Sequence, residues 1–116
     1  MNRITRVSIL LVTLTLGSRL GGMDFSRGDV NSDGGVNIAD PIFLLSYMFA
    51  NGPAPSCMDA ADVNDDGTIN ISDAVFGLSF LKPGPGGFTL PPPPYPVCGL
   101  DPTADNLDCA NFPPCP

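Results

Sequence analysis

Residues 29–40 read DVNSDGGVNIAD and residues 62–73 read DVNDDGTINISD, so one pattern returns after 33 residues. Oxygen-bearing side chains stand at alternate positions at the start of each copy, a glycine follows them, and an aspartate ends the copy. Calcium takes about six to eight oxygen ligands at roughly 2.3–2.6 Å, and a twelve-residue loop supplies them from alternate positions. The two stretches are therefore expected to be a pair of calcium-binding loops.

The expected ligands occupy equivalent positions in the two loops. They are Asp29, Asn31, Asp33, the backbone carbonyl of Gly35 and Asp40 in the first loop, and Asp62, Asn64, Asp66, the carbonyl of Thr68 and Asp73 in the second. Each loop gathers three carboxylates, an arrangement that is repulsive unless a divalent cation lies among them. A single copy could be an ordinary turn rich in Asp, Asn and Gly, but two copies at a fixed spacing favour metal binding. We expect two calcium ions.

An apolar segment follows each loop, and its spacing predicts helices over residues 38–50 and 71–82. Pro41 fits only in a first turn, and Pro83 ends the second helix. The apolar residues at helical spacings are Ile42, Phe43, Leu45, Met48 and Phe49, then Val75, Phe76, Leu78, Phe80 and Leu81. Two arrangements remain open: all of them form a shared core, or some stay exposed as a docking surface.

The repeat departs from a regular EF-hand, because each loop closes with Asp instead of Glu and no long helix precedes the first loop. Over residues 28–83, the tandem Asp-x-Asn-x-Asp-Gly-x-Val/Ile-Asn-x-x-Asp loop with its apolar helix resembles the type I dockerin family. The resemblance implies a small all-α fold in which two calcium loop-helix (F-hand) units pack antiparallel with pseudo-two-fold symmetry. It also implies a calcium-loaded module that docks on a cohesin partner, typically tethering an extracellular enzyme to a scaffold.

The resemblance further implies where a partner would bind. Contacts in the family cluster just before the closing aspartate and about two turns along the same helix. The equivalent residues are Ile38, Ala39, Leu45 and Ser46 in the first unit, and Ile71, Ser72, Leu78 and Ser79 in the second. The apolar Ile38-Ala39 pair departs from the Ser-Thr pair common in the family, which counts against recognition of an ordinary cohesin. The expected partner is therefore a cohesin-like domain.

Residues 1–22 have the layout of a secretory signal peptide. Arg3 and Arg6 precede an apolar run over 7–16, and small residues follow it. The run is too short for a transmembrane helix. An uncleaved anchor and a true start at Met23 are the alternatives. Bacterial export would place the loops outside the cell, where calcium is abundant.

The remaining chain is expected to divide into a calcium-binding domain over 25–83 and a Pro-rich connector with a stapled tail over 84–116. Prolines at 91–94 indicate extended polyproline, acting as a connector or, alternatively, binding an SH3-like domain. The tail carboxylates, Asp101, Asp105 and Asp108, could bind another ion, but they lack loop spacing, so solvated turns are expected there.

Four cysteines in an exported chain predict two disulfides. Three pairings are possible. The favoured one joins Cys57 to Cys98, clamping the tail to the linker between the repeats, and Cys109 to Cys115. A zinc site built from all four is the alternative, but the spacings lack paired Cys-x-x-Cys units.

Composition argues against catalysis. The chain contains no histidine, so a Ser-His-Asp triad or a histidine-ligated metal centre is excluded. The loop carboxylates are expected to bind calcium, and so small a domain offers little room for a substrate cleft. We therefore expect that the protein is not an enzyme and has no small-molecule substrate. The net charge of −7 disfavours nucleic acid and anionic membranes, leaving membrane contact only at the signal segment. Two functions remain: a docking module, or a calcium-stabilised structural domain or C-terminal part of a larger secreted protein.

Overall fold

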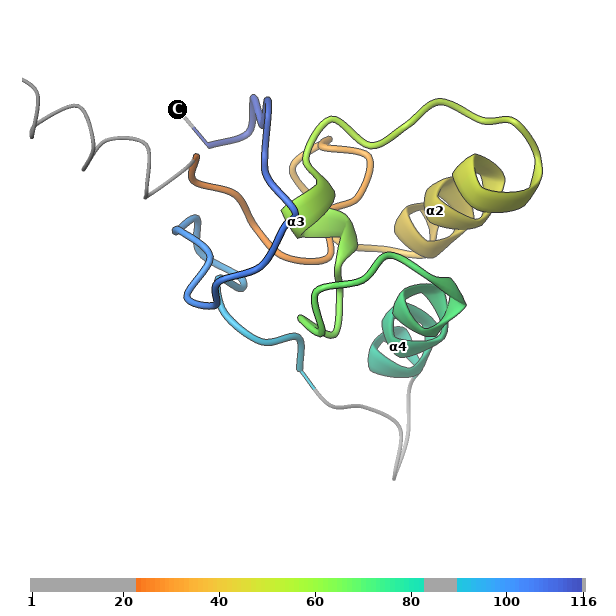
Figure 1. The fold of residues 1–116 in the computed structure, drawn as a ribbon. Helices are drawn as coiled ribbons and strands as arrows, with labels where there is room; N and C mark the ends of the chain where they lie inside the picture. The colour runs from red at the N-terminus through yellow and green to blue at the C-terminus, as the bar shows by residue number, and fades with distance from the viewer. Residues whose placement is uncertain (1–22, 83–89, 116) are drawn as a thin grey trace, which may run out of the picture.

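The computed structural model describes residues 23–82 and 90–115, and in these residues it contains three helices and no strand (Figure 1). Helix α2 spans Ala39–Phe49, α3 spans Met58–Ala61 and α4 spans Ile71–Leu81. None of the helices in these two ranges has the length and apolar character needed to cross a bilayer. The regular secondary structure of the described residues is thus all helical, as expected for a small all-α fold. The expected signal peptide and part of the expected Pro-rich connector lie outside the described residues.

The two long helices confirm the sequence prediction to within one residue at each end. The same hydrogen bonds start both helices. The Asn37 side chain accepts from the Ala39 amide at 2.9 Å, while Asp40 accepts from the Asn37 amide at 2.8 Å. The second unit repeats both bonds at 2.9 Å, with Asn70, Ser72 and Asp73 in these roles. Satisfied amides at the first turn explain why each helix begins where its loop ends.

The helix pair α2 and α4 packs through equivalent positions. The buried residues are Asp40, Pro41 and Leu44 in α2, and Asp73, Ala74 and Gly77 in α4, which are the same three positions of the repeat. A side chain carbon added at Gly77 would lie 3.8 Å from the Pro41 ring, so the two helices approach closely at this point. Val30, Ala61 and Val63 complete this core.

One of the two arrangements left open by the sequence is wrong: the apolar helix residues do not all form the shared core. Ile42, Phe49, Val75 and Leu78 are exposed, while Phe43, Leu45, Met48 and Phe76 are only partly buried against it. The reason is the short distance between the helices. Small side chains at Ala74 and Gly77 and the compact Pro41 ring meet there, and the larger side chains lie at the margins of the contact.

A second cluster joins the tail to the start of the domain. It consists of Phe25, Cys57, Ala60, Cys109, Phe112 and Cys115. Most of the tail, residues 90–115, runs beside the N-terminal segment and α3, away from α2 and α4 (Figure 1), although Tyr95 contacts Phe80 of α4. Phe25 and Gly99 exchange backbone hydrogen bonds at 2.9 and 3.0 Å. The tail is therefore a packed part of this fold.

The expected disulfides are present, but the favoured pairing is wrong. Cys57 bonds to Cys109 and Cys98 bonds to Cys115. Backbone bonds explain the first pair, because the Met58 amide donates to the Asp108 carbonyl at 3.0 Å and the Asn111 amide to the Ser56 carbonyl at 3.2 Å. These bonds align the tail antiparallel to the start of α3 and place Cys109 opposite Cys57. All four cysteines are paired, so none is a free thiolate for zinc.

Candidate metal centres

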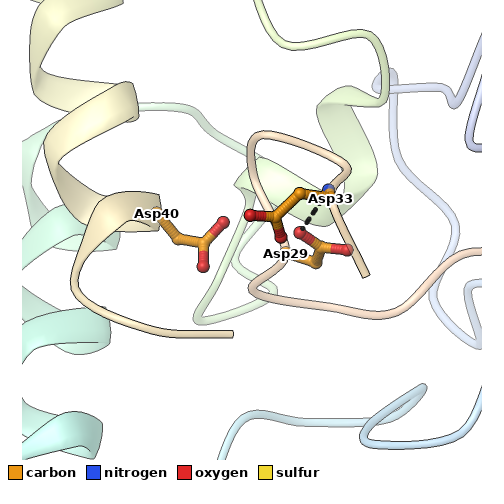
Figure 2. A group of neighbouring side chains, drawn as sticks. All are labelled: Asp29, Asp33 and Asp40. Atoms are coloured by element: carbon orange, nitrogen blue, oxygen red, sulfur yellow. Dashed lines mark hydrogen bonds between the residues drawn. The ribbon is translucent and has the colours of Figure 1, made fainter. Parts of the chain in front are cut away.

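The first loop brings Asp29, Asp33 and Asp40 together. One carboxylate oxygen from each lies within 4.8 Å of the others. Figure 2 shows Asp40, on the first turn of α2, facing Asp29 and Asp33 on the loop. Asp29 and Asp40 are buried and Asp33 is exposed, so the cluster is open to solvent on one side.

The second loop repeats this arrangement with Asp62, Asp66 and Asp73. Their carboxylate oxygens also lie within 4.8 Å of one another, and again the first and last residues are buried while the middle one is exposed. Two stretches 33 residues apart in sequence thus form the same three-carboxylate cluster.

Backbone amides hold the buried carboxylates in place. Asp29 accepts from the amides of Asp33 at 3.2 Å and Gly34 at 2.9 Å, and Asp40 accepts from those of Asn31 at 3.2 Å and Asn37 at 2.8 Å. The second loop has the same four bonds at 2.8–3.4 Å: Asp66 and Gly67 donate to Asp62, and Asn64 and Asn70 donate to Asp73. These charge-assisted bonds fix each carboxylate from the loop side.

The turn residues also match. Gly34 and Gly67 have φ of 96° and 84°, a left-handed conformation that glycine adopts without steric cost. Ser32 and Asp65, two positions earlier, have φ of 57° and 58°. Each loop therefore has glycine at the position where the backbone adopts a left-handed conformation.

The structure places the remaining predicted ligands in the same loops. The Asn31 and Asn64 side chains accept from the amides of Asp33 and Asp66, at 3.3 and 3.2 Å. Gly35 and Thr68 follow the turns, and their amides each donate at 3.0 Å to the exposed carboxylate of their loop. All ten predicted positions therefore lie within the two clusters or directly beside them.

The electrostatics of the loops favour a bound cation. Burial raises the pKa of Asp29 to about 6 and that of Asp62 to about 7, although amide hydrogen bonds oppose the rise. Repulsion from neighbouring carboxylates adds to the increase at both residues. Burial likewise raises the pKa of Asp40 and Asp73. Ionising both buried aspartates of a loop is thus costly without a compensating charge, and the all-oxygen donor set fits a hard cation such as Ca²⁺.

The residues expected to contact a partner are mostly accessible. Ile38 and Ile71 are each 54% exposed. Ala39, Ser72, Leu78 and Ser79 are exposed as well, whereas Leu45 and Ser46 are half-buried. Sequence reasoning did not assign a contact role to Ile42 and Val75, which are each 53% exposed on the turn after Ile38 and Ile71. The 33-residue repeat was the signal that could have identified this pair.

Sequence reasoning also missed Arg27, which is fully buried. Its guanidinium donates to the carbonyls of Asp59 at 3.2 Å and Asp62 at 2.9 Å. It also donates to the Pro93 carbonyl and to the Asp101 carboxylate, both at 3.0 Å. One side chain therefore connects the first ligand position of the second loop to the tail. A lone arginine in a sequence carries no signal for such a role.

Comparison with known families gives the class of the protein. Residues 27–76 match the family model described as the dockerin type I domain, and the match confirms the resemblance seen in the sequence. Over this segment the chain matches the type I dockerin family. Dockerin domains bind calcium and are protein-interaction modules that bind cohesin partners, not a catalytic family. Comparisons with curated proteins and with solved structures gave no match.

Proposed function

We propose that this chain is a calcium-dependent extracellular docking module whose partner is a cohesin-like domain. Each loop would bind one Ca²⁺ through its own five of the ten predicted ligand residues. The observation that carries the proposal is that the same positions of the two helices are buried and the same positions are exposed. Equivalent positions of α2 and α4 are buried, and equivalent apolar positions, Ile38 with Ile71 and Ile42 with Val75, are exposed to the same extent. This equivalence supports two units related by a pseudo-two-fold axis and packed antiparallel.

The loops would make docking depend on calcium through the ends of the helices. Asp40 and Asp73 belong at once to a carboxylate cluster and to the first turn of α2 or α4. A cation held by such a cluster fixes the first turn of the helix relative to its loop. Without the cation, repulsion among the carboxylates would loosen both helix starts, and with them the exposed faces.

The exposed faces are suited to a protein partner. Monomeric proteins rarely expose contiguous apolar surface without a function, and here the apolar residues repeat on both helices. Ile38 and Ile71 lie at the positions that follow from the family resemblance, and Ile42 and Val75 extend the surface by one helical turn. We infer that the partner presents an apolar pocket to Ile38 where common cohesins meet a polar pair.

The second candidate function is a calcium-stabilised structural domain, or the C-terminal part of a larger secreted protein. The packed tail favours it, because a docking role alone would not require residues 90–115 to be attached by disulfide and by Arg27. We further propose that residues 1–22 direct export, that 25–83 form the calcium-binding domain, and that 84–116 form the connector and tail.

A pull-down from the secreted proteins of the native organism, in calcium and in chelator, tests the docking proposal. One variant carries Ile38→Asp with Ile42→Asp and the other Ile71→Asp with Val75→Asp. A charge placed where the interface excludes water should weaken the binding free energy by roughly several kcal/mol. Because the two faces are equivalent, each variant should keep much of the binding, and the combination of both should lose it.

Val97→Asp is the matched control, since Val97 is 74% exposed but lies in the tail. Circular dichroism in calcium must show that every variant is folded. If the folded combined variant retains a calcium-dependent partner at wild-type affinity, the docking surface does not lie on these helix faces. If no partner is retained by the wild type in calcium, the structural function is favoured.

A further inference from the structure

One oxygen of a buried carboxylate outside the two loops has no hydrogen-bonding partner among the described residues. Asp59, on α3, is only 7% exposed, and its Oδ1 atom is buried without a hydrogen bond to any described residue. An unsatisfied buried polar atom is costly, and charged groups cost more than neutral ones. A ligand that binds this oxygen would remove the cost.

Two tail carboxylates lie around this residue. One oxygen each from Asp59, Asp101 and Asp105 lie within 4.8 Å of one another. Asp105 also belongs to a group with Asp62 and Asp65, whose oxygens meet the same limit. The site therefore lies between α3, the tail and the second calcium loop.

Positive charge at this junction is limited to one guanidinium. Arg27 lies 3.0 Å from Asp101 Oδ1 and 3.6 Å from Asp65 Oδ1. The other basic residue among residues 23–82 and 90–115, Lys82, is exposed at the end of α4. One cation thus faces at least four carboxylates, which leaves an excess of negative charge around Asp59.

We propose that Asp59, Asp101 and Asp105 form a third divalent cation site, separate from the two loops, and that its ligand is Ca²⁺. The chain offers only oxygen donors there, because it has no histidine and its cysteines are in disulfides, and oxygen donors select hard cations. Calcium tolerates irregular coordination and completes its shell with water, as a three-carboxylate site on irregular backbone requires. The site goes beyond the proposed function, which uses the loops alone.

The third site belongs to one unit of the repeat. The position equivalent to Asp59, 33 residues earlier, is Ser26, which offers no carboxylate. Asp105 also lies against the second loop, since a side chain carbon added at Gly67 would be 3.5 Å from its Cβ. A cation here would tie the tail to α3 and to the second loop, with no counterpart at the first.

Amide resonances report this site directly in a calcium titration of the full chain. The Thr103 amide donates to Asp101 Oδ1 at 3.1 Å, and the Leu107 amide donates to Asp105 Oδ1 at 2.9 Å. Gly34 and Gly67 report the two loops through their bonds to Asp29 and Asp62. We expect a distinct phase at Thr103 and Leu107, with a Kd of roughly 10⁻⁴–10⁻³ M, the range of extracellular calcium modules. Equilibrium dialysis at saturation should give three ions per chain.

Asp59→Asn and Asp105→Asn should each remove the Thr103 and Leu107 phase and one bound ion, and leave the Gly34 phase unchanged. Asp108→Asn is the matched control, because it removes a tail carboxylate outside the acidic groups, and it should keep three ions. Using two variants guards against loss of folding in either one.

Two ions in the wild type, with both substitutions leaving that number unchanged, would overturn the proposal. So would a stability gain from Asp59→Asn in saturating calcium, because the site would then hold a proton on Asp59 instead of a cation. If Gly34 and Gly67 of the wild type show no calcium-dependent change, the result counts against the loop sites and the proposed docking function. The third site is then judged on the Thr103 and Leu107 amides alone.

Discussion

Replacing Arg27 by methionine should strongly destabilise the protein. The guanidinium is fully buried and serves four backbone carbonyls, those of Asp59, Asp62, Pro92 and Pro93, as well as the Asp101 carboxylate. Methionine fills a similar volume but donates no hydrogen bond, so these carbonyls lose the guanidinium and the Asp101 carboxylate loses its buried countercharge. Removing one member of a buried ion pair costs about 3–5 kcal/mol. The free energy of unfolding of a domain is typically about 5–15 kcal/mol, so this loss is a large share of its stability.

The loss of Arg27 should also affect the two proposed calcium loops differently. Arg27 Nη1 binds the carbonyl of Asp62, the first ligand position of the second loop, and no contact of this kind joins it to a ligand of the first loop. The variant should therefore bind calcium more weakly at the second loop than at the first. Arg27→Lys keeps the charge but lacks the planar, five-donor geometry, so we expect it to recover only part of the stability.

Denaturant unfolding in saturating calcium measures the free energy of unfolding. A calcium titration followed at the Gly34 and Gly67 amides measures the affinity of each loop separately. Lys82→Met is the control, since it removes the same charge from an exposed position and should change stability by about 0.5 kcal/mol or less. A folded Arg27→Met variant within 1 kcal/mol of wild type, roughly, with equal weakening at both loops, would refute the role assigned to this residue.

Three further predictions concern the loops. Chelator should lower the melting temperature markedly, because calcium binding energy contributes to folding; an unchanged circular dichroism melt would contradict this. Asp29→Ala and Asp62→Ala should each abolish calcium binding at their own loop and leave the other loop occupied, as calorimetry would show. In chelator, stability should decrease as pH rises through about 6 to 7, because the folded-state pKa values of Asp29 and Asp62 lie above the ordinary aspartate value of 3.8 and the folded state holds more protons there. In saturating calcium, stability should instead increase with pH, since protons compete with the cation for the carboxylates. Melting temperatures measured from about pH 5 to pH 8, with calcium and with chelator, test this; the same pH dependence in both conditions would contradict it.

Local features of the fold could be predicted from the sequence. The loop bonds join residues at most nine positions apart, and the helix starts depend on bonds between residues two or three positions apart. A repeated motif therefore specifies them, and the helix bounds agree closely with the prediction. The short helix α3 was not predicted, because four residues are too few to show periodicity.

Long-range contacts account for what could not be predicted. The Cys57–Cys109 bond depends on antiparallel backbone pairing between segments 52 residues apart. The Arg27–Asp101 contact spans 74 residues. Similarly, the spacing of apolar residues marks both helices but not which face is buried, because Pro41, Ala74 and Gly77 set how closely the helices approach.

The position of the tail relative to the helix faces bears on how the module would be used. The tail reaches α4 near its end, where the Tyr95 and Phe80 rings are 5.3 Å apart. It nevertheless leaves Ile71 as exposed as Ile38, and Val75 as exposed as Ile42, so it covers neither face. Its other contacts are with α3, the N-terminal segment and the second loop. The tail therefore breaks the equivalence of the two units at the metal loops, while both helix faces remain available to a partner.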